Sequence, residues 1–140
     1  MSLTVKLDCS GIDWEAVANL LRRVGMAHYD PAVHERAFTA SHATVFILDD
    51  GKLVGFGRAI SDGEYQAAVY DCAVDPECQG KGVGSLIMKH ILDGVAGCNV
   101  ILYAAPGKEG FYRKQGFSDM RTGMAKFTSV DIMRDKGFIE

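Results

Sequence analysis

The residues best suited to chemistry form a glycine-rich loop, Gln79-Gly80-Lys81-Gly82-Val83-Gly84, between a predicted strand and a predicted helix. Glycine adopts positive φ angles without strain and lets a ligand come close to the backbone. The N–H groups in the first turn of a helix have no partner within the helix, and they carry the positive end of its dipole. A helix start of this kind binds anions, phosphate above all. A second interpretation stays open, in which the three glycines only close a tight turn.

The spacing of the glycines narrows the class of phosphate ligand. The loop does not follow the G-x-x-x-x-G-K-[ST] pattern of loops that bind nucleoside triphosphates. It also lacks the G-x-G-x-x-G pattern of dinucleotide-binding folds, and no opening βαβ unit surrounds it. Both of these common phosphate sites are therefore excluded.

The chain before the loop is predicted to open with one strand and two helices. Thr4–Leu7 alternates like a short strand, and Asp13 is a good N-cap for a helix that Gly25 ends. Asp30-Pro31 begins a second helix, which runs to about Ser41, because proline is favoured at the first helical position.

An antiparallel meander of three strands is predicted next. The β-branched and apolar segments that predict its strands are Thr44–Leu48, Leu53–Ile60 and Gln66–Val74. Asp50-Gly51 and Asp62-Gly63 are the tight turns between them. Within the middle strand, Gly55 and Gly57 weaken the pairing or mark a bulge.

The chain after the loop alternates between helix and strand signals. A helix follows the loop at once, and three further elements are expected: a strand at Asn99–Ala104, a short helix at Gly110–Gln115 closed by Gly116, and a strand at Thr122–Phe127. The tail, Thr128–Glu140, has no clear period. The order β-α-α-β-β-β-α-β-α-β predicts an α/β (α+β) fold, antiparallel early and with a parallel element late.

The composition predicts one domain over residues 1–140, with the tail 128–140 unassigned. A net charge of −3 gives no general attraction for nucleic acid. No apolar run approaches the roughly 18 residues of a membrane span, and the N-terminus lacks signal-peptide features. We therefore expect no membrane partner and a cytoplasmic location. The cysteines have no C-x-x-C spacing and the histidines are widely spaced, so no metal site is expected.

The loop and two further segments resemble one family. Gln79–Gly84 is similar to the Q/R-x-x-G-x-G/A signature of the GNAT acetyltransferases, and Asp71–Glu77 resembles that family's D-x-x-V-x-P-E strand end. Gly110–Phe117 resembles its F-Y-x-x-x-G-F hallmark. The resemblance covers the chain from the first strand to about Phe127. Gly55–Asp62 and the block after it are similar to a subgroup of short acetyltransferases, which includes plastid enzymes assigned to serotonin and protein-lysine acetylation.

The resemblance implies a GNAT fold, with a central mixed, mostly antiparallel sheet and helices on both faces. It implies acetyl-CoA as co-substrate, in a V-shaped gap between the strands Gln66–Val74 and Asn99–Ala104. The pantetheine arm would bond to the edge of the first strand, where a backbone N–H would polarise the thioester carbonyl, and the loop amides would hold the pyrophosphate. The implied binding residues are Cys72, Ala73, Val74, Gln79, Gly80, Lys81, Gly82, Val83, Gly84, Ser85, Phe111, Tyr112 and Lys114.

The resemblance implies one catalytic role, and the need to deprotonate the amine implies a second. Tyr112 matches the general acid that protonates the departing thiolate, and tyrosine, with an ordinary pKa of about 10, is protonated at neutral pH. The alternative is that Tyr112 only packs beside Phe111. Asp71 is the candidate base, because it lies in the strand at the reaction centre. Glu64, a water relay, or a purely structural role for either carboxylate are the alternatives. Strand alternation predicts that Tyr70 and Cys72 point away from the Asp71 side chain.

The sequence thus predicts an acetyl-CoA-dependent N-acetyltransferase that acts on a primary amine, either a small molecule or a lysine side chain. One alternative is a non-catalytic acetyl-CoA-binding or regulatory module on the same fold. Another is a protein-interaction domain, with a homodimer formed through the tail. The basic residues Lys108, Arg113 and Lys114 either contact the nucleotide phosphates or form a solvated helix face.

Overall fold

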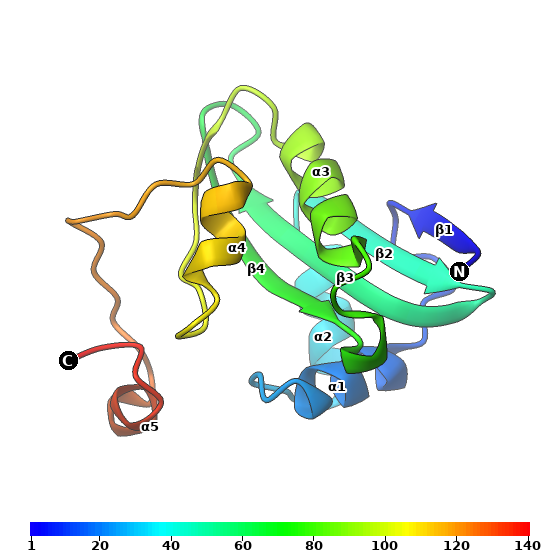
Figure 1. The fold of residues 1–140 in the computed structure, drawn as a ribbon, viewed down its shortest axis with the longest axis horizontal. Coiled ribbons are helices and arrows are strands. Elements are labelled where there is room, and N and C mark those ends of the chain that lie inside the picture. The colour runs from blue at the N-terminus through cyan, green and yellow to red at the C-terminus, as the bar shows by residue number, and fades with distance from the viewer. The chain divides into compact units, whose positions relative to one another are not determined.

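The computed structural model describes residues 1–140 as two compact units, Met1–Leu102 and Tyr103–Glu140. The larger unit holds the sheet and the three longest helices, and the smaller unit holds two short helices (Figure 1). The sequence's prediction of one domain over the whole chain stays a prediction.

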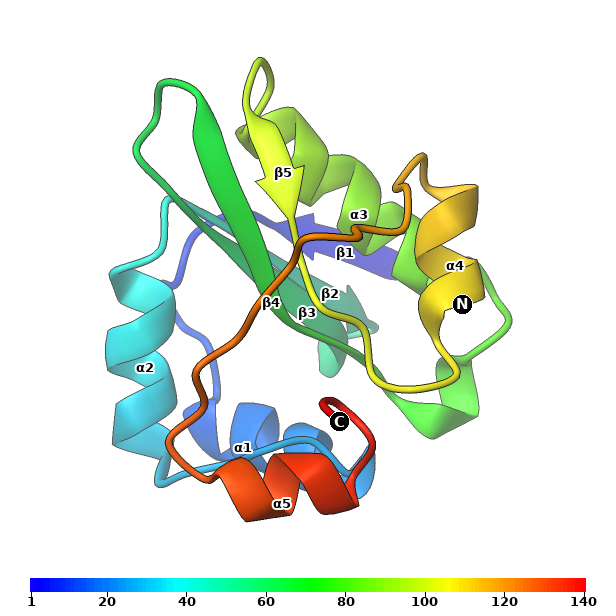
Figure 2. The ribbon, with the colours of Figure 1, turned by 90° about the vertical axis from the view of Figure 1, so that its left-hand side faces the viewer.

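The larger unit is built on one five-stranded sheet. Its strands are β1 (Leu3–Lys6), β2 (Ala43–Asp49), β3 (Lys52–Ser61), β4 (Gln66–Val74) and β5 (Asn99–Ile101), and they lie in that order across the sheet. The first three pairings are antiparallel, whereas β4 and β5 run parallel (Figure 2). The predicted meander is confirmed, and so is the tight β2–β3 turn, in which Asp50 and Gly51 have φ angles of 50° and 84°.

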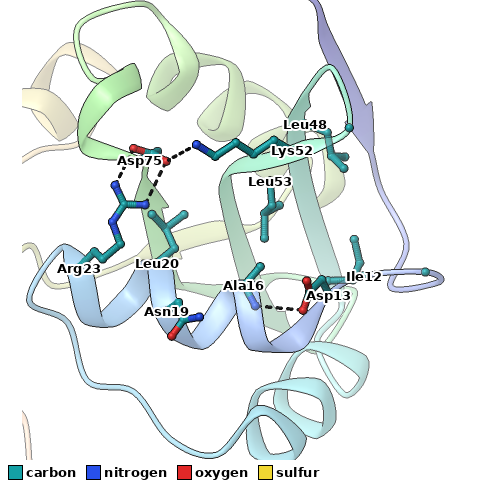
Figure 3. A pocket seen from close by; sticks show the side chains of 12 residues that line it. Ile12, Asp13, Ala16, Asn19, Leu20, Arg23, Leu48, Lys52, Leu53 and Asp75 are labelled. Atoms are coloured by element: carbon teal, nitrogen blue, oxygen red, sulfur yellow. Dashed lines mark hydrogen bonds and ion pairs between the residues drawn. The ribbon is translucent and has the colours of Figure 1, made fainter.

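Two helices lie on one face of this sheet. The helix α1 (Trp14–Arg23) begins as predicted, because the Asp13 carboxylate accepts a hydrogen bond of 3.1 Å from the amide of Ala16 (Figure 3). The helix α2 (Pro31–Thr39) has proline in its first turn and ends two residues before the predicted Ser41.

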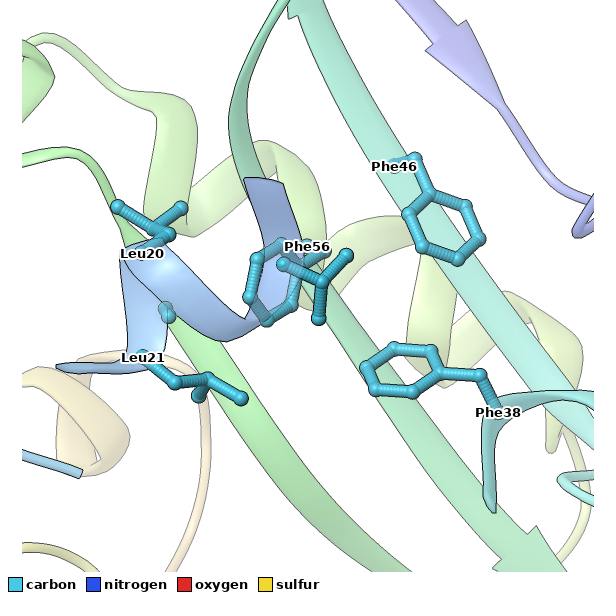
Figure 4. Close-up of a cluster of buried hydrophobic side chains, with 7 residues drawn as sticks. Leu20, Leu21, Phe38, Phe46 and Phe56 are labelled. Atoms are coloured by element: carbon cyan, nitrogen blue, oxygen red, sulfur yellow. The ribbon is translucent and has the colours of Figure 1, made fainter. Parts of the chain in front are cut away.

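The main core lies between these helices and the sheet. Phe46 of β2 and Phe56 of β3 are paired across the strands, and the ring of Phe38 from α2 packs 5.5 Å and 5.7 Å from them. Leu20 and Leu21 of α1 complete the cluster (Figure 4). All five side chains are buried, so this face carries much of the hydrophobic stabilisation of the unit.

The helix α3 (Val83–Gly94) covers the opposite face, and two glycines of β3 let it come close. A Cβ atom on Gly55 would lie 3.0 Å from side-chain atoms of Ile87 and Val83. A Cβ atom on Gly57 would lie 2.8 Å from the Cys72 sulfur. The β2–β3 register shifts beside Gly55, where β3 has one extra residue, so the bulge predicted in this strand is confirmed there. The β3–β4 register also shifts at Gly57, but its extra residue lies on β4. Close packing is the reason that both positions carry no side chain.

The smaller unit contains α4 (Glu109–Lys114) and α5 (Val130–Asp135). Three aromatic rings pack together within it: Tyr103 lies 5.4 Å from Phe127 and 5.8 Å from Phe138, as measured between ring centroids. These contacts join the two ends of the unit.

Two predictions for the end of the chain are corrected, and the unassigned tail gains a structure. The strand predicted at Asn99–Ala104 ends at Ile101, and no strand forms at Thr122–Phe127. A strand needs a partner for its backbone groups, and Phe127 instead contributes its ring to the aromatic cluster. The tail, which showed no clear period, forms the short helix α5, where the amide of Met133 donates to the carbonyl of Ser129.

The predicted fold class, a mixed and mostly antiparallel sheet with helices on both faces, is confirmed. None of the helices has both the length and the apolar character needed to cross a membrane.

Candidate functional site

The glycine-rich loop leads from β4, through the short 3₁₀ turn η1 (Pro76–Cys78), into α3. Gly80 and Gly82 have φ angles of 78° and 85°, and a Cβ atom on either would meet no other atom within 4 Å. Gly82 is the N-cap of α3, which has no side-chain cap and no acidic residue in its first turn. The first-turn N–H groups of α3 therefore lie beside the space that these glycines leave. The positive end of the α3 dipole favours an anion there.

A buried carboxylate anchors the strand end from which the loop departs. Asp75 is 1% exposed, and both guanidinium nitrogens of Arg23 donate to it over 3.2 Å. Lys52 lies 3.8 Å away, and the amide of Glu77 donates to the same carboxylate. Burial alone would raise the pKa of Asp75, but the Glu77 amide and the two cations outweigh burial and lower it. The carboxylate thus ties α1 and the β2–β3 hairpin to the start of η1.

The loop is also tied back to β4, because the side-chain amide of Gln79 donates to the carbonyl of Val74 over 3.2 Å. A pocket of about 360 Å³ lies beside the Asp75 anchor, between α1 and the β2–β3 hairpin (Figure 3). Its lining includes Asp13, Arg23, Lys52 and Asp75, and none of the predicted site residues. It is therefore distinct from the predicted gap beside β4.

The edge of β4 that faces β5 is only partly paired. The two strands pair over Gln66–Ala68 alone, although β4 continues to Val74. Beyond Ala68 no strand pairs with that edge, and an unpaired edge is the kind to which a strand-like ligand adds. Ala73 and Val74 pair on their other side with β3. The predicted binding residues Cys72, Ala73 and Val74 thus lie on a strand with one open edge.

A β-bulge interrupts β4 at the predicted reaction centre. Tyr70 pairs with Arg58 and Ala73 pairs with Phe56, so Asp71 and Cys72 together oppose the single residue Gly57. Asp71 has a φ angle of 55°, in the left-handed region. The prediction that Tyr70 points away from Asp71 is wrong, because both side chains contact Arg58. The inserted residue breaks the alternation on which that prediction rested.

Arg58, a residue outside the predicted site, holds the Asp71 carboxylate. Its Nε donates to Asp71 Oδ2 over 2.7 Å. One signal was available in the sequence: Arg58 is the only charged residue between Lys52 and Asp62, in an otherwise apolar and glycine-rich strand. Charged side chains rarely lie in such strands unless they are paired.

Cys72, the second residue of the bulge, has a thiol that stays protonated at neutral pH. Burial, together with the charge of Asp71, raises the pKa of the Cys72 thiol to about 12. The thiolate is the nucleophilic form of cysteine, so Cys72 is unsuited to carry an acyl group.

The second predicted motif lies in the smaller unit. The Tyr112 ring packs 5.1 Å from Phe111 and 6.0 Å from Phe117, and the amide of Phe117 donates to the carbonyl of Tyr112. Arg113 donates two hydrogen bonds, of 2.9 Å and 3.0 Å, to the carboxylate of Asp119. Of the three basic residues Lys108, Arg113 and Lys114, Arg113 therefore has a structural partner within the smaller unit. The roles assigned to Tyr112, Asp71 and the binding residues stay predictions.

A buried histidine makes the larger unit sensitive to acid. His34 is 3% exposed, and its Nε2 accepts a hydrogen bond of 2.9 Å from the amide of Tyr29. Burial lowers the pKa of His34; Arg58 and His28 also lower it, whereas Asp71 opposes them. The histidine is therefore neutral in the folded state, and its contribution to stability is present above the ordinary pKa of about 6.5. That contribution is lost as the pH falls through the lower folded-state value.

We expect the free energy of unfolding to fall by about 1 kcal/mol more between pH 7.5 and pH 5 in the wild type than in His34→Gln, the scale of one buried hydrogen bond. Glutamine keeps an acceptor and does not titrate in this range. Urea unfolding at both pH values measures the difference, and the exposed His42→Gln is the control. Equal acid sensitivity in wild type and His34→Gln would contradict the assignment.

No group of three or more His, Cys, Asp or Glu side chains is arranged to hold a metal ion.

Comparisons with known proteins agree with this geometry. The model of the acetyltransferase (GNAT) domain matches residues 41–119. The chain is 35% identical over 137 residues to serotonin N-acetyltransferase 2, chloroplastic, of Oryza sativa subsp. japonica, and the match covers 89% of this chain and 68% of the rice protein. It is 30% identical over 131 residues to GCN5-related N-acetyltransferase 1, chloroplastic, of Arabidopsis thaliana, covering 90% of this chain and 66% of that one. The chain thus spans about two thirds of these relatives.

A solved structure gives the same result for the fold. The GNAT family acetyltransferase SP0256 from Streptococcus pneumoniae is 30% identical, with a TM-score of 0.75 over 90% of this chain and 98% of that one. The family model and the rice relative together identify this chain as a member of the GNAT family of N-acetyltransferases, and hence as an acyltransferase.

Proposed function

We propose that the protein transfers the acetyl group of acetyl-CoA directly to a primary amine. The observation that supports this most is the combination of a β4 edge that is unpaired beyond Ala68 with a glycine-rich helix start that follows the same strand. Acetyl-CoA would require these two features next to each other, because its extended pantetheine arm would pair with the strand edge and the attached pyrophosphate would bind at the helix start.

The loop suits a pyrophosphate because it offers backbone N–H groups as hydrogen-bond donors. Gly80 and Gly82 leave space beside the start of α3, and no acidic side chain in the first turn repels an anion. Lys81 is exposed and adds positive charge. In this proposal the amides from Gly80 to Ser85 hold the phosphates, and the β4 edge at Cys72–Val74 aligns the pantetheine arm.

Acetyl-CoA supplies the thioester, and the residues of this chain would act on it in three ways. A backbone N–H at the bulge would polarise the carbonyl, as an oxyanion-type donor. Tyr112 would give its proton to the departing thiolate. The proton of the amine would pass to water, because Asp71 would have to give up its ion pair with Arg58 in order to accept it. Glu64, the other candidate base, lies in the turn seven residues before Asp71. That separation is about 20 Å along an extended strand, so Glu64 is too far from Asp71 to replace it as the base.

Direct transfer, without an acyl-enzyme on Cys72, is the route that we propose. Cys72 lies within the bulge, but its raised pKa keeps that thiol protonated at neutral pH.

The acceptor class is proposed from the relatives. The rice relative carries the name of a serotonin N-acetyltransferase, so arylalkylamines are the first acceptors to test. Lysine side chains are the second class, because the sequence is equally compatible with a protein acceptor. Cytoplasmic location and a homodimer stay predictions.

The test is thiol release from acetyl-CoA with a panel of amines that holds arylalkylamines, polyamines, amino sugars, amino acids and lysine peptides. We expect turnover with one class and a thermal shift with acetyl-CoA alone, about 2.7 kcal/mol of stabilisation at 100 times Kd. A thermal shift without turnover on any amine would favour the non-catalytic binding module. The absence of both would overturn the proposal.

A further inference from the structure

We infer that Arg58 is a positioning residue of the reaction centre, which holds the β4 bulge in shape through its ion pair with Asp71. The inference rests on the proposed function, because it assigns the bulge amides to the polarisation of the thioester carbonyl. It gives the Asp71 carboxylate a positioning role in place of the role of general base.

The backbone at Asp71 is strained and needs support. A left-handed φ angle is unfavourable for residues other than glycine, although Asp and Asn tolerate it better than most. Only two such residues have a positive φ angle in this chain, Asp50 at 50° and Asp71 at 55°. Asp50 lies in a tight hairpin turn, where this conformation is ordinary. Asp71 lies inside a strand, where only the surroundings can maintain it.

The surroundings of Asp71 are centred on Arg58. The pair is 2.7 Å long, and the side chains of Arg58 and Asp71 are only 16% and 24% exposed. The guanidinium lies 5.6 Å from the centroid of the Phe38 ring and 5.6 Å from that of the Tyr70 ring. Two rings at these distances fix the plane of the guanidinium and shield it from water. A partly buried, rigid ion pair restrains the backbone more than an ion pair on the surface does. We call the Arg58–Asp71 pair the clamp.

A hydrogen-bond chain connects the clamp to α2. The Arg58 Nη1 donates to Ser41 Oγ over 3.3 Å, and Ser41 Oγ donates to the carbonyl of Ala37 over 2.8 Å. The orientation of Arg58 is thus set by a helix as well as by β4.

The bulge is confined from the other face too. Gly57, the residue opposite the bulge, has no space for a Cβ atom, which would lie 2.8 Å from the Cys72 sulfur. The Arg58–Asp71 pair on the α2 face and the close approach of Gly57 to Cys72 on the α3 face both restrict the backbone at Asp71 and Cys72. The amides there are therefore preorganised before any ligand binds.

The first experiment compares Asp71→Ala, Asp71→Asn and Asp71→Gly in the acetyl-transfer assay. Alanine resists the left-handed conformation, whereas glycine and asparagine adopt it. We expect kcat to fall at least about tenfold further in the alanine variant than in the glycine variant, with the pH dependence of kcat/KM unchanged in the glycine and asparagine variants. A general base predicts the opposite: equal loss in all three variants, and loss of the acidic limb of the profile, where protonation of the base lowers the rate.

The second experiment places Arg58→Met in two backgrounds. In the wild type we expect kcat to fall about tenfold, with little change in the KM for acetyl-CoA, because misplaced donors impair chemistry more than binding. In Asp71→Gly, where the backbone needs no support, the same change should cost about twofold or less. Equal losses in both backgrounds, or none in the wild type, would overturn the inference.

Controls separate strain from function. Asp50→Ala and Asp50→Gly repeat the backbone change in the hairpin, and they should alter Tm without altering kcat. Hydrogen exchange at the amides of Cys72 and Ala73 tests the clamp without turnover: Arg58→Met should speed it by about tenfold or more. If the wild type has no activity, the proposed function fails, whereas unchanged exchange in Arg58→Met overturns the clamp itself.

Discussion

Replacing Gly82 with glutamate is expected to raise the Kd for acetyl-CoA by about 100-fold or more, the equivalent of roughly 3 kcal/mol. The new carboxylate would occupy the open space at the start of α3, where the helix dipole and the loop amides favour a phosphate. Two negative groups in one site repel each other, and a side chain at φ 85° also strains the loop. Isothermal titration with acetyl-CoA measures the change.

Two controls separate the contributions of charge and of backbone strain to this change in Kd. Gly82→Lys introduces the same strain with the opposite charge, so it should bind acetyl-CoA more tightly than Gly82→Glu. Gly97→Glu places a glutamate at φ 87°, in open space just beyond the other end of α3, and should leave the Kd unchanged. An unchanged Kd in Gly82→Glu, with the fold intact, would show that the loop closes a turn and does not hold the phosphates.

The variant Tyr112→Phe is expected to lower kcat about 100-fold, the usual scale for the loss of one general acid. The ring contacts with Phe111 and Phe117 do not need the hydroxyl, so the packing of the motif should be kept. The Kd for acetyl-CoA should therefore change by less than about twofold, because the lost interaction acts on the departing thiolate. Thiol release at saturating acceptor measures kcat, and titration measures Kd.

A matched variant is Tyr65→Phe, which removes a hydroxyl from an exposed tyrosine in the β3–β4 turn. It should retain wild-type kcat. Full activity in Tyr112→Phe would remove this residue from the mechanism and leave it the packing role that the sequence analysis kept open.

Local patterns predicted most of the larger unit. The cap at Asp13, the turn at Asp50-Gly51 and the strand Gln66–Val74 are confirmed. In each case the signal lies within a few neighbouring residues, as a capping side chain, a glycine with positive φ, or an alternating apolar run. The predicted strand at Thr122–Phe127 is wrong, because a strand exists only if a partner lies beside it, and the sequence of one segment does not contain its partner.

The sequence by itself determined the glycine-rich connection into α3, the order of the elements up to α4 and the family of the enzyme, since all three depend on residues close together in the chain. Only the tertiary structure decided the bulge at Asp71, the clamp by Arg58 and the Asp75 anchor. The Arg58–Asp71 pair joins residues 13 positions apart, and the Arg23–Asp75 pair joins residues 52 positions apart. Such pairs form because folding buries the charges together, and a buried charge is stable only beside its partner.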